Sequence, residues 1–254
     1  MKKLKLFIGV ILLSFTLSCS NDDDEFNYEP QTILDIIQSN PNYSYLSNAL
    51  QKTGLYTSFD GSNADDRYTL YAPNDMAFAR FLTTSGFNSI DDVPLDVLKK
   101  VLLNHVMVDI IRYRDFETGY YKTAAQYING SSINNLSIYI EQINMRVTLN
   151  GDARITQGNV NASNGIIHAV NSVIPIPSIV TFAKADKNLE ILLSALTRPD
   201  LTTDFPSILG TDMGTSPAPF TVFAPVNQAF IDLSLIHISE PTRRYAISYA
   251  VFCL

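Results

Sequence analysis

One ten-residue stretch occurs twice in the chain, and this duplication constrains the fold more than any other feature. Residues 69–78 have the sequence T-L-Y-A-P-N-D-M-A-F, and residues 221–230 have the sequence T-V-F-A-P-V-N-Q-A-F. Thr, Ala, Pro, a second Ala and the final Phe recur at the same places, with an aromatic residue before each Ala-Pro. Internal repeats indicate repeated structural units. We therefore expect two units, each organised around one copy.

Each copy predicts a strand that turns directly into a helix. Residues 69–71 are rich in strand-forming side chains, and Pro73 cannot donate a hydrogen bond to a strand ladder. Asn74 or Asp75 can then cap the free N–H groups of a new helix. Phe78 begins the apolar face of that helix. The stretch carries no reactive group, so we interpret it as a packing element.

Three motifs, taken in chain order, resemble the signatures of the fasciclin-like domain, an extracellular adhesion and binding module. The first is the stretch at residues 69–78, and the last is N-G-I-I-H-A-V-N-S-V-I-P-I-P at residues 164–177. Between them, residues 102–106 match the family's Leu-x-Tyr-His-Val element, with Asn104 where Tyr is usual. The resemblance assigns the fold-signature positions to Thr69, Ala72, Pro73, Asp75, Phe78, His105, Asn164, Gly165, His168 and Pro175.

The order of helical and strand patterns predicts an α+β fold. Thr32 can cap a first helix, residues 44–53 have helical periodicity with Gly54 as C-cap, and Pro94 favours the start of a later helix. From His105 the apolar period changes to two. We expect strands at residues 105–111, 119–123, 137–140, 145–149, 153–159 and 166–169.

Two turn signals are expected among these strands. Asn150-Gly151 is typical of a two-residue hairpin turn, and Gly165 after Asn164 is expected to supply a turn with positive φ. The resemblance implies N-terminal helices packed on a β-wedge or sandwich of about seven strands. It places the first fasciclin-like unit at residues 31–178 and a truncated second unit at residues 179–232.

The N-terminus has the pattern of a targeting segment. Three lysines precede an apolar run at residues 6–17, which is shorter than the roughly 20 residues that span a bilayer. We interpret residues 1–18 as a signal peptide. Cys19 then resembles the lipid-attachment cysteine of a bacterial lipoprotein; a secretory peptide with an incidental cysteine is the alternative.

The acidic run at residues 20–25 follows this cysteine, and residues 19–30 would form a lipidated tether. In certain Gram-negative bacteria such runs resemble signals that send lipoproteins to the outer face of the outer membrane. A merely solvated tether is the alternative. We expect a surface-exposed outer-membrane lipoprotein of the cell envelope.

The last 22 residues have an unusual origin. Residues 233–243, L-S-L-I-H-I-S-E-P-T-R, and residues 247–254, I-S-Y-A-V-F-C-L, match the in-frame translation of a transposon-based sequencing adapter. We therefore interpret residues 233–254 as an artefact without native structure. The interpretation removes His237 and Cys253 from every chemical argument. Sequencing of the genomic locus would test it.

The ionisable residues do not form a pattern typical of an enzyme or a metal site. The formal net charge of −7 disfavours nucleic acid as a partner. The sequence lacks a G-x-S-x-G turn and the H-x-x-x-H or C-x-x-C spacing of zinc sites. Of the two remaining histidines, each is more simply a core residue with satisfied hydrogen bonds. We expect no catalytic residue, metal or cofactor.

The resemblance also implies contact positions, because partner-binding segments of animal fasciclin-like domains fall near the second and third motifs. The matching candidates are Asn104, His105, Asn171 and Ile174, with Asn171 where Asp is usual. Five tyrosines are further candidates for binding protein or sugar surfaces, with cross-strand packing as the alternative. They are Tyr113, Tyr120, Tyr121, Tyr127 and Tyr139.

The expected function is non-enzymatic. We predict adhesion to, or binding of, an extracellular matrix protein or polysaccharide, with membrane attachment through Cys19. One alternative is a glycan-capture accessory of an outer-membrane nutrient-uptake system. The other is an envelope hydrolase that uses His105 with a carboxylate.

Overall fold

The structure is a computed structural model that describes residues 30–63, 65, 67–129, 131–211, 216, 218–236 and 249–253. The expected signal peptide, Cys19 and most of the tether lie outside these residues. The helical elements are α1 (Ile33–Ser39), η1 (Pro41–Tyr43), α2 (Ser44–Thr53), η2 (Leu55–Ser58), α3 (Asp75–Thr84), η3 (Ile90–Asp92), α4 (Leu95–Asn104), α5 (Ile179–Ala185), η4 (Lys187–Leu189), α6 (Glu190–Leu196), α7 (Phe205–Leu209) and α8 (Asn227–Ile236). The strands are β1 (Tyr68–Pro73), β2 (Val106–Met107), β3 (Gly119–Asn129), β4 (Ser132–Ile143), β5 (Arg146–Leu149), β6 (Ala153–Ala162), β7 (Gly165–Val170), β8 (Thr221–Pro225) and β9 (Tyr249–Cys253).

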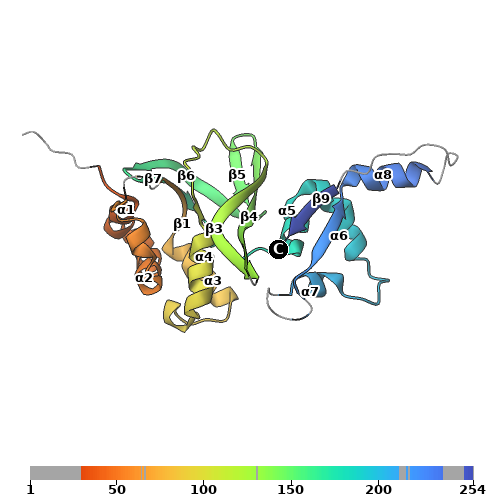
Figure 1. Ribbon diagram of the computed structural model, residues 1–254, viewed down its shortest axis with the longest axis horizontal. Helices are drawn as coiled ribbons and strands as arrows, with labels where there is room; N and C mark the ends of the chain where they lie inside the picture. The colour runs from red at the N-terminus through yellow and green to blue at the C-terminus, as the bar shows by residue number, and fades with distance from the viewer. Residues whose placement is uncertain are drawn as a thin grey trace, which may run out of the picture.

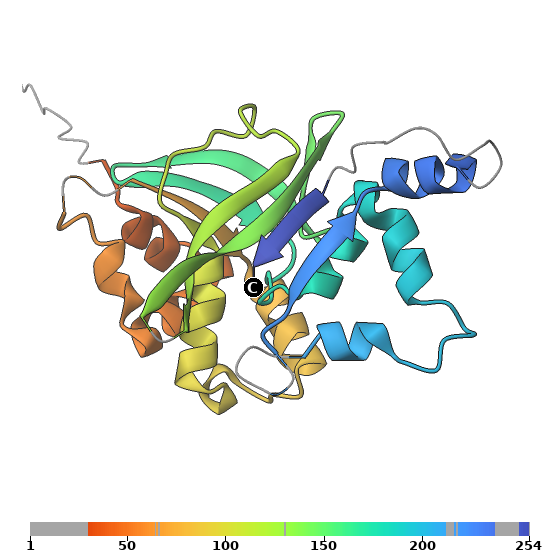
Figure 2. The same ribbon diagram turned by 45° about the vertical axis from the view of Figure 1, so that its right-hand side comes forward.

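The first unit has the predicted α+β architecture. Helices α1 and α2 lie to the left of the strands, α3 and α4 lie below them, and the second unit lies to the right (Figures 1 and 2). Thr32 caps α1, since its hydroxyl accepts a hydrogen bond from the backbone N–H of Asp35. Gly54 ends α2 in the left-handed conformation with φ +71°, as its position after the apolar face predicts.

The strands form one seven-stranded mixed sheet in the order β2-β1-β7-β6-β5-β4-β3. Only β1 and β7 pair in parallel, and all other neighbours in this sheet are antiparallel. The sheet curls so far that its two end strands, β2 and β3, contact each other. The curl separates a core under the helices, which includes Phe78, from a second core inside the strands, which includes Tyr71.

The prediction of a strand at residues 105–111 is wrong for most of these residues. His105 is the C-cap of α4, and only Val106–Met107 pair with β1. Beyond them the Thr69 hydroxyl donates to the carbonyl oxygen of Asp109 (2.7 Å) and accepts from the N–H of Ile111 (2.9 Å). A buried side chain therefore satisfies backbone groups that a strand ladder would otherwise have paired.

The expected turns have different outcomes. Asn150 and Gly151 both have positive φ, +49° and +74°, and form the predicted hairpin turn between β5 and β6. The expectation of positive φ at Gly165 is wrong, because Gly165 does not have this conformation. A Cβ at Gly165 would lie 2.3 Å from the carbonyl oxygen of Tyr68, so close strand packing requires this glycine.

The second copy of the stretch again forms a strand and a helix, β8 and α8. Helix α8 continues to Ile236, and β9 pairs antiparallel with β8. Both reach into residues 233–254, whose adapter origin stays a prediction. Residues 249–253, Y-A-V-F-C, favour a strand on propensity alone, and the edge of β8 offers unpaired backbone groups. Within the described residues, the structure has no helix with the length and apolarity that a bilayer span requires.

Candidate functional site

Asn164 lies where the helices meet the sheet and joins three segments there. Its side-chain oxygen accepts from the N–H of Ile33 (2.9 Å), and its amide donates to the carbonyl oxygen of Phe59 (3.0 Å). Its own carbonyl oxygen accepts from the N–H of Tyr68 (3.3 Å). The side chain is buried, and its polar atoms bond to α1 and to the residue that follows η2, while the main chain of Asn164 bonds to β1.

Asp75 has a different role from the one the sequence allowed. Asn74, not Asp75, caps α3 by accepting from the N–H of Ala77 (2.9 Å). The Asp75 carboxylate instead accepts from the hydroxyl of Ser44 (2.6 Å) and from the N–H of Tyr45 (2.9 Å). The carboxylate thus satisfies the first turn of α2, where a negative charge also suits the helix dipole.

Asn104 and His105 hold the segment that leaves the sheet after β7. The Asn104 amide donates to the carbonyl oxygens of Ile174 (3.4 Å) and Pro175 (3.0 Å). His105 Nε2 accepts from the N–H of Ile174 (2.8 Å), and its Nδ1 lies 2.8 Å from the carbonyl oxygen of Val101. Nδ1 therefore carries the proton, and both ring nitrogens are occupied by backbone groups.

His168 is held in a similar way inside the curled sheet. Its Nδ1 accepts from the N–H of Asn159 (3.2 Å), and its Nε2 donates to the carbonyl oxygen of Ile111 (2.9 Å). Its ring stacks near Tyr71 and meets Phe116 edge to face, with centroids 6.1 Å and 5.4 Å away.

Burial makes the charged form of each imidazole unfavourable. It lowers the pKa of His105 to about 4 and lowers the pKa of His168, while the hydrogen bonds to the carbonyl oxygens of Val101 and Ile111 act in the opposite direction. Neutral, fully bonded histidines lack a free nitrogen for proton transfer. This geometry does not favour the hydrolase alternative.

The predicted contact residues have different surroundings. Asn104, His105 and Ile174 are buried, with 1% exposure or less, so they have almost no surface for a partner in this conformation. Asn171 is half-buried, and its side-chain oxygen accepts from the N–H of Arg154 (2.8 Å). These four residues are not one surface patch; they support the segments that surround them.

The five tyrosines also separate into different groups. Tyr113 donates to the carbonyl oxygen of Met145 (2.6 Å), and Tyr121 donates to that of Glu117 (3.1 Å), while Tyr127 is half-buried. Tyr120 and Tyr139 pack together with centroids 4.9 Å apart. These two rings belong to the contact between the units.

That contact is centred on Asp186, the buried residue that follows α5. Its carboxylate accepts from the hydroxyls of Tyr120 (2.9 Å) and Tyr139 (3.5 Å), and Phe182 meets the Tyr120 ring edge to face. Nearby, Lys187 forms an ion pair of 2.7 Å with Glu141. No local sequence pattern indicates this contact, because it joins residues that are 47 and 66 positions apart in the chain.

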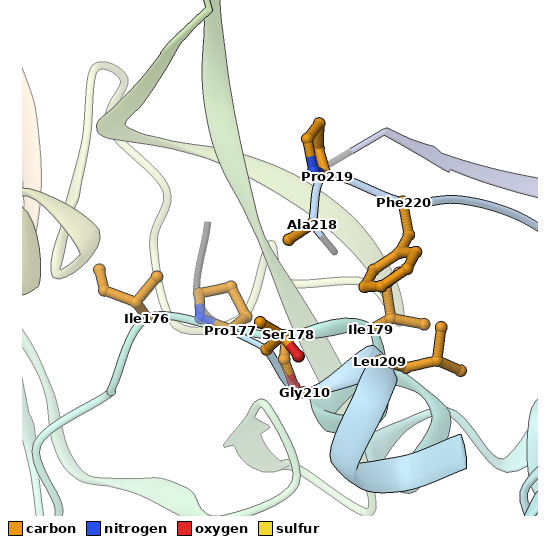
Figure 3. A pocket seen from close by; sticks show the side chains of 10 residues that line it. Ile176, Pro177, Ser178, Ile179, Leu209, Gly210, Ala218, Pro219 and Phe220 are labelled. Atoms are coloured by element: carbon orange, nitrogen blue, oxygen red, sulfur yellow. The ribbon is translucent and has the colours of Figure 1, made fainter. Parts of the chain in front are cut away.

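Two hollows occur near these elements. A small one, of about 50 Å³, lies where the connecting segment meets the second unit, with Pro177, Ser178 and Ile179 near Leu209 and Phe220 (Figure 3). A larger one, of about 400 Å³, lies between the end of β2 and β3. Among the described residues, no group of three or more His, Cys, Asp or Glu side chains is arranged to hold a metal ion.

Comparison with known proteins places these features in context. The family model described as "Fasciclin domain" matches residues 41–177. Human periostin is 28% identical over 165 residues, which are 64% of this chain but only 18% of periostin. The chain therefore spans less than a fifth of that curated relative. A solved FAS1 domain pair from the insect cell adhesion molecule Fasciclin I has 17% identity and a TM-score of 0.44, over 59% of this chain and 52% of that one.

Proposed function

This chain belongs to the fasciclin domain family, and from that membership we propose that it is a non-enzymatic binding protein of the cell surface. It would recognise an extracellular matrix protein or polysaccharide. The family is associated with adhesion and binding proteins such as periostin.

One observation carries this proposal: the polar side chains of the signature motifs form their hydrogen bonds inside the domain. His105 and His168 each have both ring nitrogens bonded to backbone groups. Asn164 and Asp75 likewise bond to backbone groups of neighbouring helices. Side chains committed in this way build a rigid scaffold, and rigid scaffolds favour recognition by surrounding surface and loops.

The proposal includes attachment to the membrane through a lipid on Cys19, and exposure on the outer membrane. The support is the sequence pattern alone, since Cys19 lies outside the described residues. Two or more acyl chains would give stable membrane binding that a single chain does not. Cys19→Ala should release the protein into the soluble fraction; an unchanged membrane fraction would contradict the anchor.

Adhesion can be measured with whole cells. Cells that display the full chain should adhere to surfaces coated with collagen, fibronectin or polysaccharide more strongly than cells without it. Pre-incubation with the purified chain should reduce that adhesion. Equal adhesion of both strains to every coating would contradict the proposal.

The hydrolase alternative has its own test. Turnover of an ester, amide or glycoside substrate that disappears in His105→Gln, with the fold intact by circular dichroism, would replace binding with catalysis. We expect no such turnover, because neither nitrogen of His105 is free to accept a proton from a nucleophile.

A glycan-capture role in nutrient uptake is the second form of the same binding function. It would be distinguished from adhesion by loss of growth on a polysaccharide after deletion of the gene, with unchanged adhesion to coated surfaces.

A further inference from the structure

The larger hollow lies where the curled sheet fails to close completely. The end strands β2 and β3 each have one neighbour in the sheet order, so their other edges face the gap between them. Between Lys122 and Gln126 the pairing of β3 with β4 is irregular. Irregularities of this kind bend a strand and redirect its side chains, and they are frequent beside binding sites.

The volume and lining of this hollow suit a small polar ligand. Its volume of about 400 Å³ lies within the range of roughly 300–1,000 Å³ that is typical of ligand pockets. It is lined by Met107, Val108, Asp109, Ile111, Tyr121, Lys122, Thr123 and Asn135. The lining combines apolar side chains with one ammonium group, one carboxylate, one amide and the hydroxyl groups of Tyr121 and Thr123.

The walls of the hollow are held by the signature residues Thr69 and His168 and by the predicted contact residue Asn104. The Thr69 hydroxyl bonds to the backbone of Asp109 and Ile111, and His168 donates to the carbonyl oxygen of Ile111. On the other side, Thr123 donates to the side-chain oxygen of Asn104 (3.3 Å). These hydrogen bonds hold the segments that line the hollow in place before a ligand binds, which lowers the entropic cost of binding.

Met107 and Asn135 are held as well. The Tyr71 hydroxyl donates to the sulfur of Met107 (3.1 Å), and the Asn135 amide donates to the carbonyl oxygen of Thr123 (2.7 Å). The Asn135 side chain also carries an amide oxygen, which can accept a hydrogen bond. The hollow is therefore a formed site whose rim keeps hydrogen-bonding capacity.

The charges at the rim favour an uncharged ligand with many hydroxyl groups. Among the described residues, neither Lys122 nor Asp109 takes part in an ion pair, although both line the same hollow. One positive and one negative group together give the site no net charge, so neither an anion nor a cation is favoured overall. A hydroxyl group can accept from the ammonium and donate to the carboxylate. Val108 is 69% exposed and gives the rim an apolar surface for the C–H face of a sugar ring.

We propose that this hollow binds one or two residues of a neutral saccharide, so that the gap between β2 and β3 is a carbohydrate site. The inference rests on the proposed binding function and names polysaccharide as its ligand class. Lys122, Asp109 and Asn135 bond to sugar hydroxyls, and Val108 and Ile111 contact the ring. Thr69, Asn104 and His168 are positioning residues that hold the walls.

Affinity electrophoresis of the full chain in gels containing dextran, galactomannan or xylan tests the proposal. We expect at least one of these neutral polysaccharides to retard the chain. Lys122→Ala and Asp109→Asn should each weaken that retardation by roughly tenfold in Kd, as expected for loss of a hydrogen bond to a charged group. Val108→Trp should abolish it by filling the entrance.

The matched control is Lys184→Ala, which removes an exposed lysine of α5 that does not line the hollow. It should leave the retardation unchanged. The sites of all four substitutions are exposed, so their melting temperatures should stay within a few degrees of the parent chain. Lys122 on an edge strand could also serve only to prevent edge pairing; Lys122→Ala would then aggregate more without losing affinity, and the proposal would fail.

The remaining outcomes are decisive too. Retardation that is equal in the parent chain and in Val108→Trp would overturn the site while leaving polysaccharide binding as the function. Adhesion to collagen or fibronectin without retardation by any neutral polysaccharide would overturn the site and leave the proposed function intact. Retardation by alginate alone, which is polyanionic, would also overturn it.

Discussion

The two copies of the repeated stretch make the same local contact but have different surroundings. In the first unit the Asp75 side chain accepts from the N–H of Tyr45 at 2.9 Å. At the corresponding place in the second unit, the Asn227 side chain accepts from the N–H of Ile191, also at 2.9 Å. The loop-to-helix contact is therefore repeated with a carboxylate in one unit and an amide in the other.

Burial distinguishes the copies clearly. Tyr71 is fully buried, whereas Phe223 at the same position is 66% exposed. The sheet explains this difference: β1 lies between β2 and β7 in a seven-stranded sheet, while β8 pairs only with β9 in the described residues. The comparison shows that the stretch forms its strand and helix locally, but that the surrounding strands decide how much of it is buried.

The largest expected effect comes from removing the closing phenylalanine of each copy. Phe78 is fully buried, so Phe78→Ala should destabilise the first unit by about 4 kcal/mol. Phe230 is only partly buried, and Phe230→Ala should cost about 1 kcal/mol. Hydrogen exchange measured separately over the two units would show this. Equal losses of unfolding free energy in the two variants would mean that the two phenylalanines are packed equally well.

Strands β7 and β1 of the first unit lie close together at Gly165, and Gly165→Ala should disrupt this packing. The new Cβ would lie 2.3 Å from the carbonyl oxygen of Tyr68, and we expect a loss of about 3 kcal/mol. Gly119→Ala is the matched control, because a Cβ there meets nothing within 4 Å. Urea denaturation followed by circular dichroism should separate them; similar midpoints would contradict the steric argument.

Lowering the pH should reduce the free energy of unfolding of the first unit, because His105 is buried there. The folded-state pKa of His105 is about 4, against about 6.5 in an unfolded chain, so the unfolded state binds more protons between these values. This contribution is complete above pH 6.5 and is lost as the pH falls towards 4, a change of about 3 kcal/mol. In His105→Gln, the melting temperature should change much less with pH than in the parent chain. An unchanged slope would assign the effect to other groups.

Substitutions at Asp75 compare the carboxylate of the first copy with the amide that occupies the same position in the second copy. Asp75→Ala removes the acceptor for Ser44 and Tyr45 and should cost about 1.5 kcal/mol. Asp75→Asn, which copies the second unit, should recover about half of that. Thermal melts of the three proteins provide the measurement, and an Asn variant as unstable as the Ala variant would show that the amide cannot replace the carboxylate.

The smallest effect is expected for the exposed ion pair at the contact between the units. Lys187→Ala removes an ion pair with Glu141 whose lysine is 69% exposed, and exposed pairs contribute about 0.5 kcal/mol or less. Phe182→Ala is the informative partner variant, because Phe182 is buried against Tyr120. It should loosen exchange protection across the contact much more than Lys187→Ala; the reverse order would show that charge, not packing, joins the units.

The proposed adapter origin of residues 233–254 bears directly on this comparison. Those residues include β9, the strand that pairs with β8. Genomic sequencing that finds different residues after Asp232 would give the second unit other partners for β8. Genomic confirmation of the present sequence would make β9 part of the native second unit and refute the proposed origin.

Local signals in the sequence were enough to determine much of the fold. The cap at Thr32, the left-handed Gly54 and the turn at Asn150-Gly151 are all confirmed. Each depends on backbone preferences and side-chain bonds within a few residues, and these preferences act before tertiary contacts form. The order of helices followed by strands was visible for the same reason.

Only the tertiary structure decided the roles of the candidate site residues. Asn104 and His105 hold a segment about 70 residues later in the chain, and Asp75 serves a helix 30 residues earlier. The hollow between β2 and β3 likewise exists because the sheet curls until its ends meet without closing. Sequence patterns report the neighbours along the chain, whereas burial and long-range hydrogen bonds are set by packing of distant segments.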